Sequence, residues 1–257
     1  MSKNQPMPPV KAAPFAPVEF ANRLEAAARR SGFRVERFGE ADGCPLLALT
    51  KRTPGPRPRI YASAGIHGDE PAPPHALLGL LEAGAFDTRA VWFLCPMLNP
   101  AGLARGSREN ASGIDLNRDY RDVRSPEVGA HVAWLRRQPN FDLTLCLHED
   151  WESTGFYLYE QNPDGQPSLA DALTAAAARF CPIDMSPVIE GREARAGVIR
   201  PVGDPLEREQ WPESIYLRAN HTRLAYTVET PSSLPLGQRV ETLHAVVSAA
   251  IEATARP

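Results

Sequence analysis

Three apolar, strand-like runs of the sequence each end in a residue that can bind a metal ion or carry a proton. RIYASAG leads into His67 and Glu70, DLTLCL leads into His148, and RLAYTV leads into Glu229. Neighbouring parallel strands lie about 4.8 Å apart, so the ends of three such strands can converge on one point. The sequence therefore predicts a polar site at the carboxyl edge of a sheet.

His67, Glu70 and His148 are the candidate metal ligands. Two imidazoles and one carboxylate are a common ligand set for catalytic zinc, which keeps its fourth position for water. Gly65 and Gly68 permit the tight turn that such a pair requires. A single histidine would more simply be a core or surface residue, and we interpret the other histidines as structural or solvated: His75, His131, His221 and His244.

Glu229 is the candidate base, because it directly follows an apolar run and Pro231 lies two residues later. Water bound to a metal needs a group that takes its proton, and a buried carboxylate can do this. The alternative is a surface glutamate that opens a turn.

The segment 99–124 is rich in Gly, Asn, Arg and Asp and lacks apolar periodicity, so we expect a long functional loop without regular structure. Guanidinium and amide groups recognise carboxylates, so this loop suits the anionic end of a substrate. The alternative is a solvated basic loop whose charge is balanced by Asp115, Asp119 and Asp122. Its cations and amides are Arg105, Arg108, Arg118, Arg121, Arg124, Asn99, Asn110 and Asn117.

These motifs together resemble the zinc carboxypeptidase family. The order His67-x-x-Glu70, NPAGLARGSRENASGIDLNRDY, His148 and Glu229 in VETP is similar to that of the metallocarboxypeptidases, the murein peptide amidases and the succinylglutamate desuccinylase/aspartoacylase group. The motifs span residues 67–229. The resemblance implies one Zn²⁺ per chain, held by His67, Glu70 and His148, with Glu229 as the general base.

The resemblance also implies roles for residues of the loop. Arg108 would polarise the scissile carbonyl, with Arg105 as the second candidate for that role. Asn117 and Arg118 would grip the terminal carboxylate of the substrate. Tyr216 is the candidate for the tyrosine that covers the substrate.

The elements that must position these residues alternate along the chain, which favours an α/β fold. We expect a single domain with a mostly parallel, mixed, twisted sheet and helices on both faces, as in zinc carboxypeptidases. Residues 18–257 would form this domain, after a proline-rich tail over residues 1–17. Helices are expected over 18–30, 75–82, 125–134, 168–180 and 235–253, and strands over 45–49, 59–64, 90–98, 142–147, 155–159 and 223–228.

Composition excludes several functional classes. The formal charge is −3, without a basic run that could follow a phosphate backbone, so nucleic acid is not an expected partner. No stretch approaches the ~20 apolar residues of a membrane span, and the N-terminus lacks the apolar core of a secretory signal. We therefore expect a cytoplasmic protein. Its four cysteines are expected to be reduced and buried.

The leading hypothesis is a zinc-dependent hydrolase that cleaves an amide bond next to a free carboxylate, as a metallocarboxypeptidase or peptide amidase. The alternative is an N-acyl amino acid deacylase of the aspartoacylase type. Those relatives usually carry a further β domain, whereas only one helix is expected after Glu229, which favours peptides. A binding module without catalysis is a third hypothesis. We expect segments 151–154 and 195–212 to line the specificity pocket. For Trp151 and Trp211 we expect packing, with walls of that pocket as the alternative.

Overall fold

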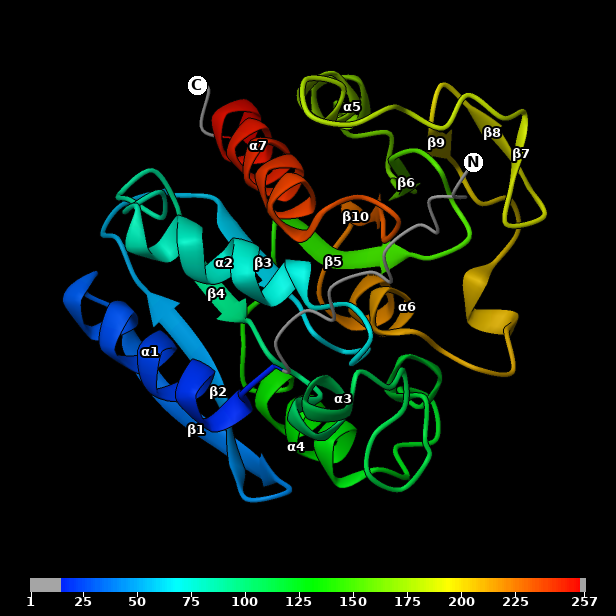
Figure 1. Ribbon diagram of the computed structural model, residues 1–257. Coiled ribbons are helices and arrows are strands. Elements are labelled where there is room, and N and C mark those ends of the chain that lie inside the picture. The colour runs from blue at the N-terminus through cyan, green and yellow to red at the C-terminus, as the bar shows by residue number, and fades with distance from the viewer. Residues whose placement is uncertain (1–14, 255–257) are drawn as a thin grey trace, which may run out of the picture.

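A mixed ten-stranded sheet runs through the middle of the molecule in the computed structural model, which describes residues 15–254 (Figure 1). Its strands are β1 (Arg34–Ala41), β2 (Cys44–Lys51), β3 (Arg59–Ser63), β4 (Val91–Cys95), β5 (Leu143–Asp150), β6 (Tyr157–Gln161), β7 (Val188–Ile189), β8 (Arg192–Arg195), β9 (Val198–Ile199) and β10 (Ala225–Pro231). The helices are α1 (Pro17–Arg30), α2 (Ala72–Glu82), α3 (Pro100–Arg105), α4 (Pro126–Leu135), α5 (Ala170–Ala177), α6 (Glu213–Asn220) and α7 (Leu236–Thr254). Two short 3-10 helices are η1 (Leu116–Arg118) and η2 (Pro205–Glu207).

Parallel pairing is concentrated at the centre of the sheet. The strand order is β1-β2-β4-β3-β5-β10-β6-β9-β8-β7. Strands β4, β3, β5 and β10 are mutually parallel, whereas β1, β2 and β4 pair antiparallel at one edge and β6 is antiparallel to β10. The expected mixed α/β sheet is confirmed, with three of its parallel pairings at the centre and a fourth, between β6 and β9, toward the other edge.

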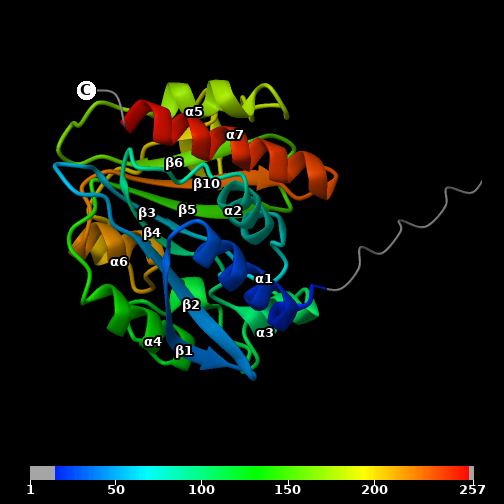
Figure 2. The same cartoon turned by 90° about the vertical axis from the view of Figure 1, so that its left-hand side faces the viewer.

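Helices cover both faces of the sheet, as expected. Figure 2 shows α1, α2, α5 and α7 on one side and α4 and α6 on the other. Central strands of a parallel sheet are buried on both faces and are therefore continuously apolar. Strand β5 follows this rule, since every residue from Leu143 to Glu149 is buried.

The expectation of an unstructured segment over 99–124 is wrong, because α3 and η1 lie within it. Asn99 caps α3 by accepting a hydrogen bond from the Gly102 amide, Pro100 stands at the first helical position, and Gly106 ends the helix in the left-handed region at φ 62°. The same signals predicted α4, and Ser125 indeed caps it through the Val128 amide. A helix of six residues is too short for apolar periodicity to reveal it.

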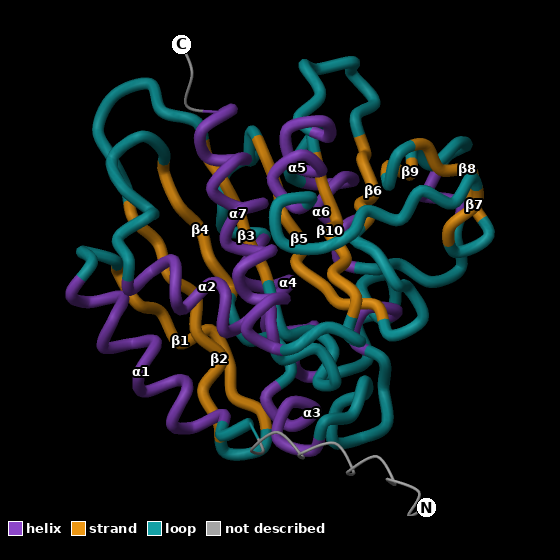
Figure 3. The backbone as a smooth tube through the Cα atoms, turned by 45° about the horizontal axis from the view of Figure 1, so that its top comes forward, coloured by secondary structure: helices purple, strands orange, loops and turns teal. Residues whose placement is uncertain are grey.

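Several elements were not expected from the sequence. They are β1, α6 and the small ribbon of β7, β8 and β9 at the far edge of the sheet (Figure 3). The ribbon turns at Glu190-Gly191 and Ala196-Gly197, where all four residues have positive φ. Strands of two to four residues bury too few side chains to produce an alternating pattern.

Residues 1–14 of the expected tail lie outside the described residues, and α1 begins at Pro17. The four cysteines are free and buried, as expected. Within residues 15–254, no helix combines the length and the apolar character needed to cross a bilayer.

Candidate metal centre

The turn after β3 brings His67 and Glu70 to the carboxyl edge of the sheet. Gly65 adopts φ +65°, a conformation that other residues rarely take. Gly68 lies directly against α3, where an added Cβ atom would stand 1.9 Å from the carbonyl carbon of Gly102. Glycine is therefore required at both positions, at Gly65 because of its positive φ and at Gly68 because the turn packs closely on α3.

His67, Glu70 and His148 converge on one buried point. One possible ligand atom from each residue lies within 4.8 Å of the others. The two carboxylate oxygens of Glu70 contact the two histidines, with Oε1 2.5 Å from His67 Nδ1 and Oε2 2.9 Å from His148 Nδ1. The side chains of all three residues are at most 5% exposed. The structure thus brings the predicted ligand set together from the β3–α2 turn and β5.

The charges of this group depend on one another. Burial lowers the pKa of His67, but the Glu70 and Asp115 carboxylates outweigh it and raise that pKa to about 9. Burial raises the pKa of Glu70, but the two histidines hold it well below the usual range. Two imidazoles and a carboxylate facing one another fit zinc by their donor types. Metal binding would displace the imidazole protons, so metal affinity would depend on pH.

Asp115 is a supporting residue, whereas its sequence position predicted only that it balances the charge of the basic loop. Its Oδ1 lies 3.2 Å from Nε2 of His67, and its Oδ2 accepts a hydrogen bond of 3.0 Å from Nε of Arg108. A carboxylate on the second ring nitrogen fixes the orientation of a metal-binding histidine. Asp115 thereby couples Arg108 to His67, which lies 48 residues before Asp115 in the chain. Asp115 directly precedes η1, and nothing in the neighbouring sequence indicates that it contacts His67.

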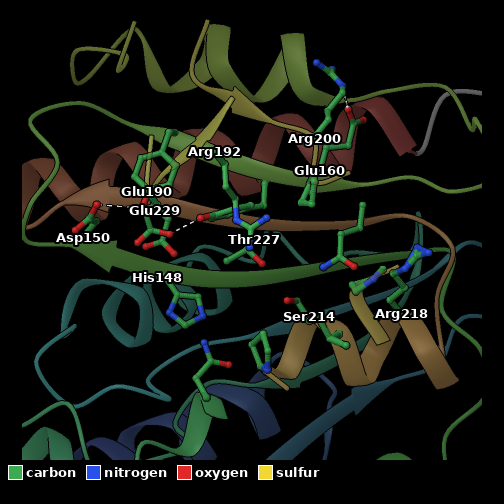
Figure 4. A pocket seen from close by; sticks show the side chains of 18 of the residues that line it. His148, Asp150, Glu160, Glu190, Arg192, Arg200, Ser214, Arg218, Thr227 and Glu229 are labelled. Carbon is green, nitrogen blue, oxygen red and sulfur yellow. Dashed lines mark hydrogen bonds and ion pairs between the residues drawn. The ribbon is translucent and has the colours of Figure 1, made fainter. Parts of the chain in front are cut away.

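Glu229 lies beside the ligands because of strand register. It pairs with His148 across the parallel β5–β10 ladder and with Tyr157 across the antiparallel β6–β10 ladder. Burial raises the pKa of Glu229 well above its usual value, and Glu70, Glu190 and Asp150 add to this while His148 opposes it. Figure 4 shows His148, Asp150, Glu190 and Glu229 close together at one end of the cavity. A carboxyl with a raised pKa suits proton transfer near neutral pH.

A cavity of about 1170 Å³ opens from this point. Arg108, Asn117 and Arg118 line one part of it, together with His67, Glu70, His148 and Glu229. Both segments expected to line a specificity pocket contribute, the first through Trp151 and Glu152 and the second through residues 200–205, 208 and 212.

Some arginines of the 99–124 segment lie where they could bind a substrate, and others lie as expected for a solvated basic loop. Arg108 and Arg118 line the cavity, and Arg108 NH1 lies 3.8 Å from Oε1 of Glu70. Arg105 is exposed at the end of α3 and does not line the cavity, so the structure favours Arg108 over Arg105. Arg121 and Arg124 also lie away from it, and Arg124 pairs with aspartates, as in a solvated basic loop.

The structure does not bring Tyr216 to the cavity, which corrects the expectation of a substrate-covering role. Tyr216 is 6% exposed and packs in the core against Tyr120 and His221, because α6 turns this face toward the sheet. Tyr157 and Tyr159 of β6 line the cavity instead. The position of these two tyrosines beside Glu229 depends on the pairing of β6 with β10, which the sequence does not show.

The two tryptophans also differ. Trp151 is 73% exposed and lines the cavity, so the expectation that it serves packing is wrong. Trp211 is partly buried and packs on the core, as expected.

Residues 56–196 match the model of the succinylglutamate desuccinylase/aspartoacylase catalytic domain, and this match shows the family of the chain. The chain belongs to this family. The matched span includes His67, Glu70, Arg108 and His148, whereas Glu229 lies beyond it. A curated relative, carboxypeptidase SOL1 of Arabidopsis thaliana, is 33% identical over 112 residues. That match covers 35% of this chain and 23% of the relative, so the chain spans about a quarter of the relative's length.

Solved structures share the fold. A protein of Shewanella amazonensis SB2B assigned as a metallopeptidase is 27% identical, with a TM-score of 0.80 and 91% of each chain covered. A metallo-carboxypeptidase of Burkholderia cenocepacia is 20% identical, with a TM-score of 0.71, and the match covers 93% of this chain and 69% of that one. A metallo-carboxypeptidase of Pseudomonas aeruginosa, in complex with (2-guanidinoethylmercapto)succinic acid, is 22% identical, with a TM-score of 0.67 and coverage of 95% and 70%.

These comparisons confirm the expected zinc carboxypeptidase-like family and fold, and they support the expected class of carboxypeptidase-type metal hydrolase. The substrate and the choice between peptidase and deacylase belong to the proposal that follows.

Proposed function

We propose that this protein is a zinc-dependent hydrolase that cleaves an amide bond next to a free carboxylate, as a metallocarboxypeptidase or peptide amidase. The observation that carries the proposal is that a buried His67-Glu70-His148 group, a neighbouring carboxyl of raised pKa and two arginines all face one cavity. Metal binding, proton transfer and anion recognition are the functions that such a hydrolysis requires.

His67, Glu70 and His148 would hold the metal ion. When bound, zinc lowers the pKa of a coordinated water to about 7 and polarises a carbonyl group. Glu229 would accept a proton from the attacking water and pass it to the leaving amine. Its raised pKa favours both transfers, because a base of very low pKa would not retain the proton.

Two arginines of the cavity would each stabilise a different negatively charged group of the substrate. Arg108 lies 3.8 Å from Glu70, next to the ligand group, and would stabilise charge that develops on the carbonyl oxygen. Arg118 and Asn117 lie on the neighbouring η1 and would bind the terminal carboxylate of the substrate. A free carboxylate would thus align the last amide bond with Glu229.

The experiment is zinc analysis combined with a hydrolysis panel. We expect about one zinc per wild-type chain and a lower content in His67→Ala, with Arg105→Ala as a control of unchanged content. Peptides with a free C-terminal carboxylate should be cleaved, and the same peptides with an amidated C-terminus should resist. Equal zinc content in His67→Ala and the wild type, or equal cleavage of acids and amides, would contradict the proposal.

Deacylation of an N-acyl amino acid is the second candidate, and a specific observation favours it. Arg192, Arg208 and Arg218 line the cavity, and none of them forms an ion pair among residues 15–254, whereas Arg200 pairs with Glu160. Burial lowers the pKa of Arg208, and the charges of Arg192 and Arg118 lower it further. Such a group of like charges favours a substrate with a second anionic group.

The same panel separates the two candidates. N-acetyl derivatives of aspartate and glutamate should be hydrolysed faster than free-acid peptides if the protein is a deacylase. The reverse order supports the peptidase.

A further inference from the structure

Glu213 is a buried carboxyl outside the cavity, at the first position of α6. It is 1% exposed and forms no ion pair with lysine, arginine or histidine among the described residues. Its two oxygens instead accept hydrogen bonds from β3, Oε1 from the Tyr61 hydroxyl at 2.7 Å and Oε2 from the Ser63 hydroxyl at 2.8 Å. A buried carboxyl costs free energy unless its hydrogen bonds are made, so this arrangement calls for a function.

A directed chain of hydrogen bonds ends at this carboxyl. His131 Nε2 lies 3.0 Å from the Tyr61 oxygen, and His131 Nδ1 lies 2.7 Å from the Tyr120 oxygen. Since Tyr61 donates to Glu213, His131 must donate to Tyr61 through Nε2 and accept from Tyr120 through Nδ1. Burial lowers the pKa of His131 to about 3, so the ring is neutral and can make both contacts.

The main chain of Glu213 connects this network to the cavity. Its N–H donates to Oδ1 of Asn117 at 2.9 Å, in a buried contact. The Asn117 N–H in turn donates to Oδ1 of Asp115, which contacts His67. Because Oδ1 is directed at the Glu213 N–H, the Nδ2 donors on the other arm of the Asn117 amide are the group that can contact a ligand in the cavity. The next residue, Ser214, lines the cavity beside Arg218, as Figure 4 shows.

We infer that Glu213 is a positioning residue that fixes the amide of Asn117 for binding a substrate carboxylate. The inference rests on the proposed function, in which Asn117 and Arg118 bind that group. Tyr61 and Ser63 hold the Glu213 side chain, and through it the first turn of α6, against β3. If this turn moved, the Asn117 amide could rotate and present Oδ1 to the anion, which replaces an attraction by a repulsion.

A pair of tyrosine variants separates positioning from general stability. Tyr61 and Tyr120 are both buried and both contact His131, but of the two only Tyr61 hydrogen-bonds to Glu213. Tyr61→Phe and Tyr120→Phe should therefore lower the melting temperature alike. Tyr61→Phe should also raise KM for a free-acid peptide roughly fivefold while kcat changes less than about twofold, as expected when uniform binding is lost. Tyr120→Phe should leave KM within about twofold of the wild type.

A direct binding measurement provides a readout besides activity. Succinate is titrated calorimetrically into the zinc-loaded wild type and both variants, with succinamide as the neutral control of similar size. We expect the Kd of succinate to rise roughly fivefold in Tyr61→Phe alone, which corresponds to about 1 kcal/mol. Glu213→Gln, which keeps an acceptor, should raise the Kd less than Glu213→Leu does.

The outcomes distinguish the two proposals. A wild type that binds succinate but cleaves no free-acid peptide contradicts the proposed function, while the titration still decides the role of Glu213. Equal shifts of Kd in Tyr61→Phe and Tyr120→Phe would overturn the positioning role. A wild type that binds succinate no better than succinamide would overturn both the carboxylate site and this role.

Discussion

Glu70 is buried and Glu229 is half-buried, yet the neighbours of these two carboxyls give them opposite protonation behaviour. Glu70 faces two imidazoles, which hold its pKa well below the usual range. Glu229 faces one histidine and three carboxyls, and burial together with these carboxyls raises its pKa. A carboxylate that stays ionised suits metal binding, and one that can take a proton suits catalysis. At the scale of single residues, the environment assigns the two roles.

The first prediction concerns Glu229. Glu229→Gln keeps the shape of the side chain but cannot accept a proton, so kcat should fall by a factor of roughly 10² to 10⁴. Zinc content should stay at the wild-type level, because Glu229 is not in the ligand group. Steady-state kinetics and elemental analysis of the same preparation measure both quantities. Loss of zinc would make Glu229 a ligand, and normal turnover would return it to a structural role.

The second prediction separates the arginines. Arg118→Ala should raise KM more than it lowers kcat, because a carboxylate contact is made in the ground state and the transition state alike. Arg108→Ala should mainly lower kcat, because charge on the carbonyl oxygen develops only in the transition state. Arg105→Ala is the matched control from the same loop and should change neither constant. An effect on kcat in Arg105→Ala, with none in Arg108→Ala, would reverse the assignment.

At the scale of elements, the turn after β3 and helix α3 form one unit. Gly68 lies against the Gly102 carbonyl, and Asn99, which caps α3, also donates to the carbonyl oxygens of Ile66 and Arg108. The ligand turn and the arginine loop are thus connected by one asparagine side chain. Displacement of α3 would move His67 and Arg108 together.

The third prediction follows from this contact. Gly68→Ala places a Cβ atom 1.9 Å from backbone, which cannot be relieved by side-chain rotation. We expect the free energy of unfolding to fall by about 3 kcal/mol or more, and zinc affinity to fall with it. Gly237→Ala at the start of α7, where nothing lies within 4 Å, is the control and should be near neutral. Urea unfolding of both variants measures the difference, and equal stabilities would contradict the packing argument.

At the scale of the whole molecule, the His131 network ties one helical layer to the sheet. His131 belongs to α4, Tyr61 to the central strand β3, and Glu213 to α6. The network lies in the core cluster on the face of the sheet covered by α4 and α6. Because every link is buried, protonation of this histidine would disrupt the packing of the entire layer.

The fourth prediction is a pH dependence of stability. The pKa of His131 is about 3 in the folded protein, below the ordinary value of 6.5, so the unfolded chain binds more protons between these two pH values. Its contribution to stability is therefore complete above pH 6.5 and is lost as the pH falls toward 3. Between pH 7 and pH 5 the wild type should lose about 2 kcal/mol more than His131→Gln does. Urea unfolding at both pH values tests this, and parallel losses in the two proteins would contradict it.

The sequence by itself determined the features that depend on neighbouring residues. Ser125-Pro126 begins a helix as predicted, and Asn99-Pro100 carries the same local signal, although no helix was expected there. The apolar runs that become β3, β5 and β10 are visible as buried strands. His67 and Glu70 stand three residues apart between glycines, so their shared turn was predictable. These signals are local, since each depends on hydrogen bonds or burial within a few residues.

Only the tertiary structure decided which distant residues complete the site. Strand register places Glu229 beside His148 and Tyr157, and the packing of α6 turns Tyr216 into the core. The choice of Arg108 over Arg105 depends on where α3 ends and on the contact with Asp115. The pairings of Glu229 join residues tens of positions apart, and their geometry follows from how the strands align and the layers pack, which no pattern along the chain records.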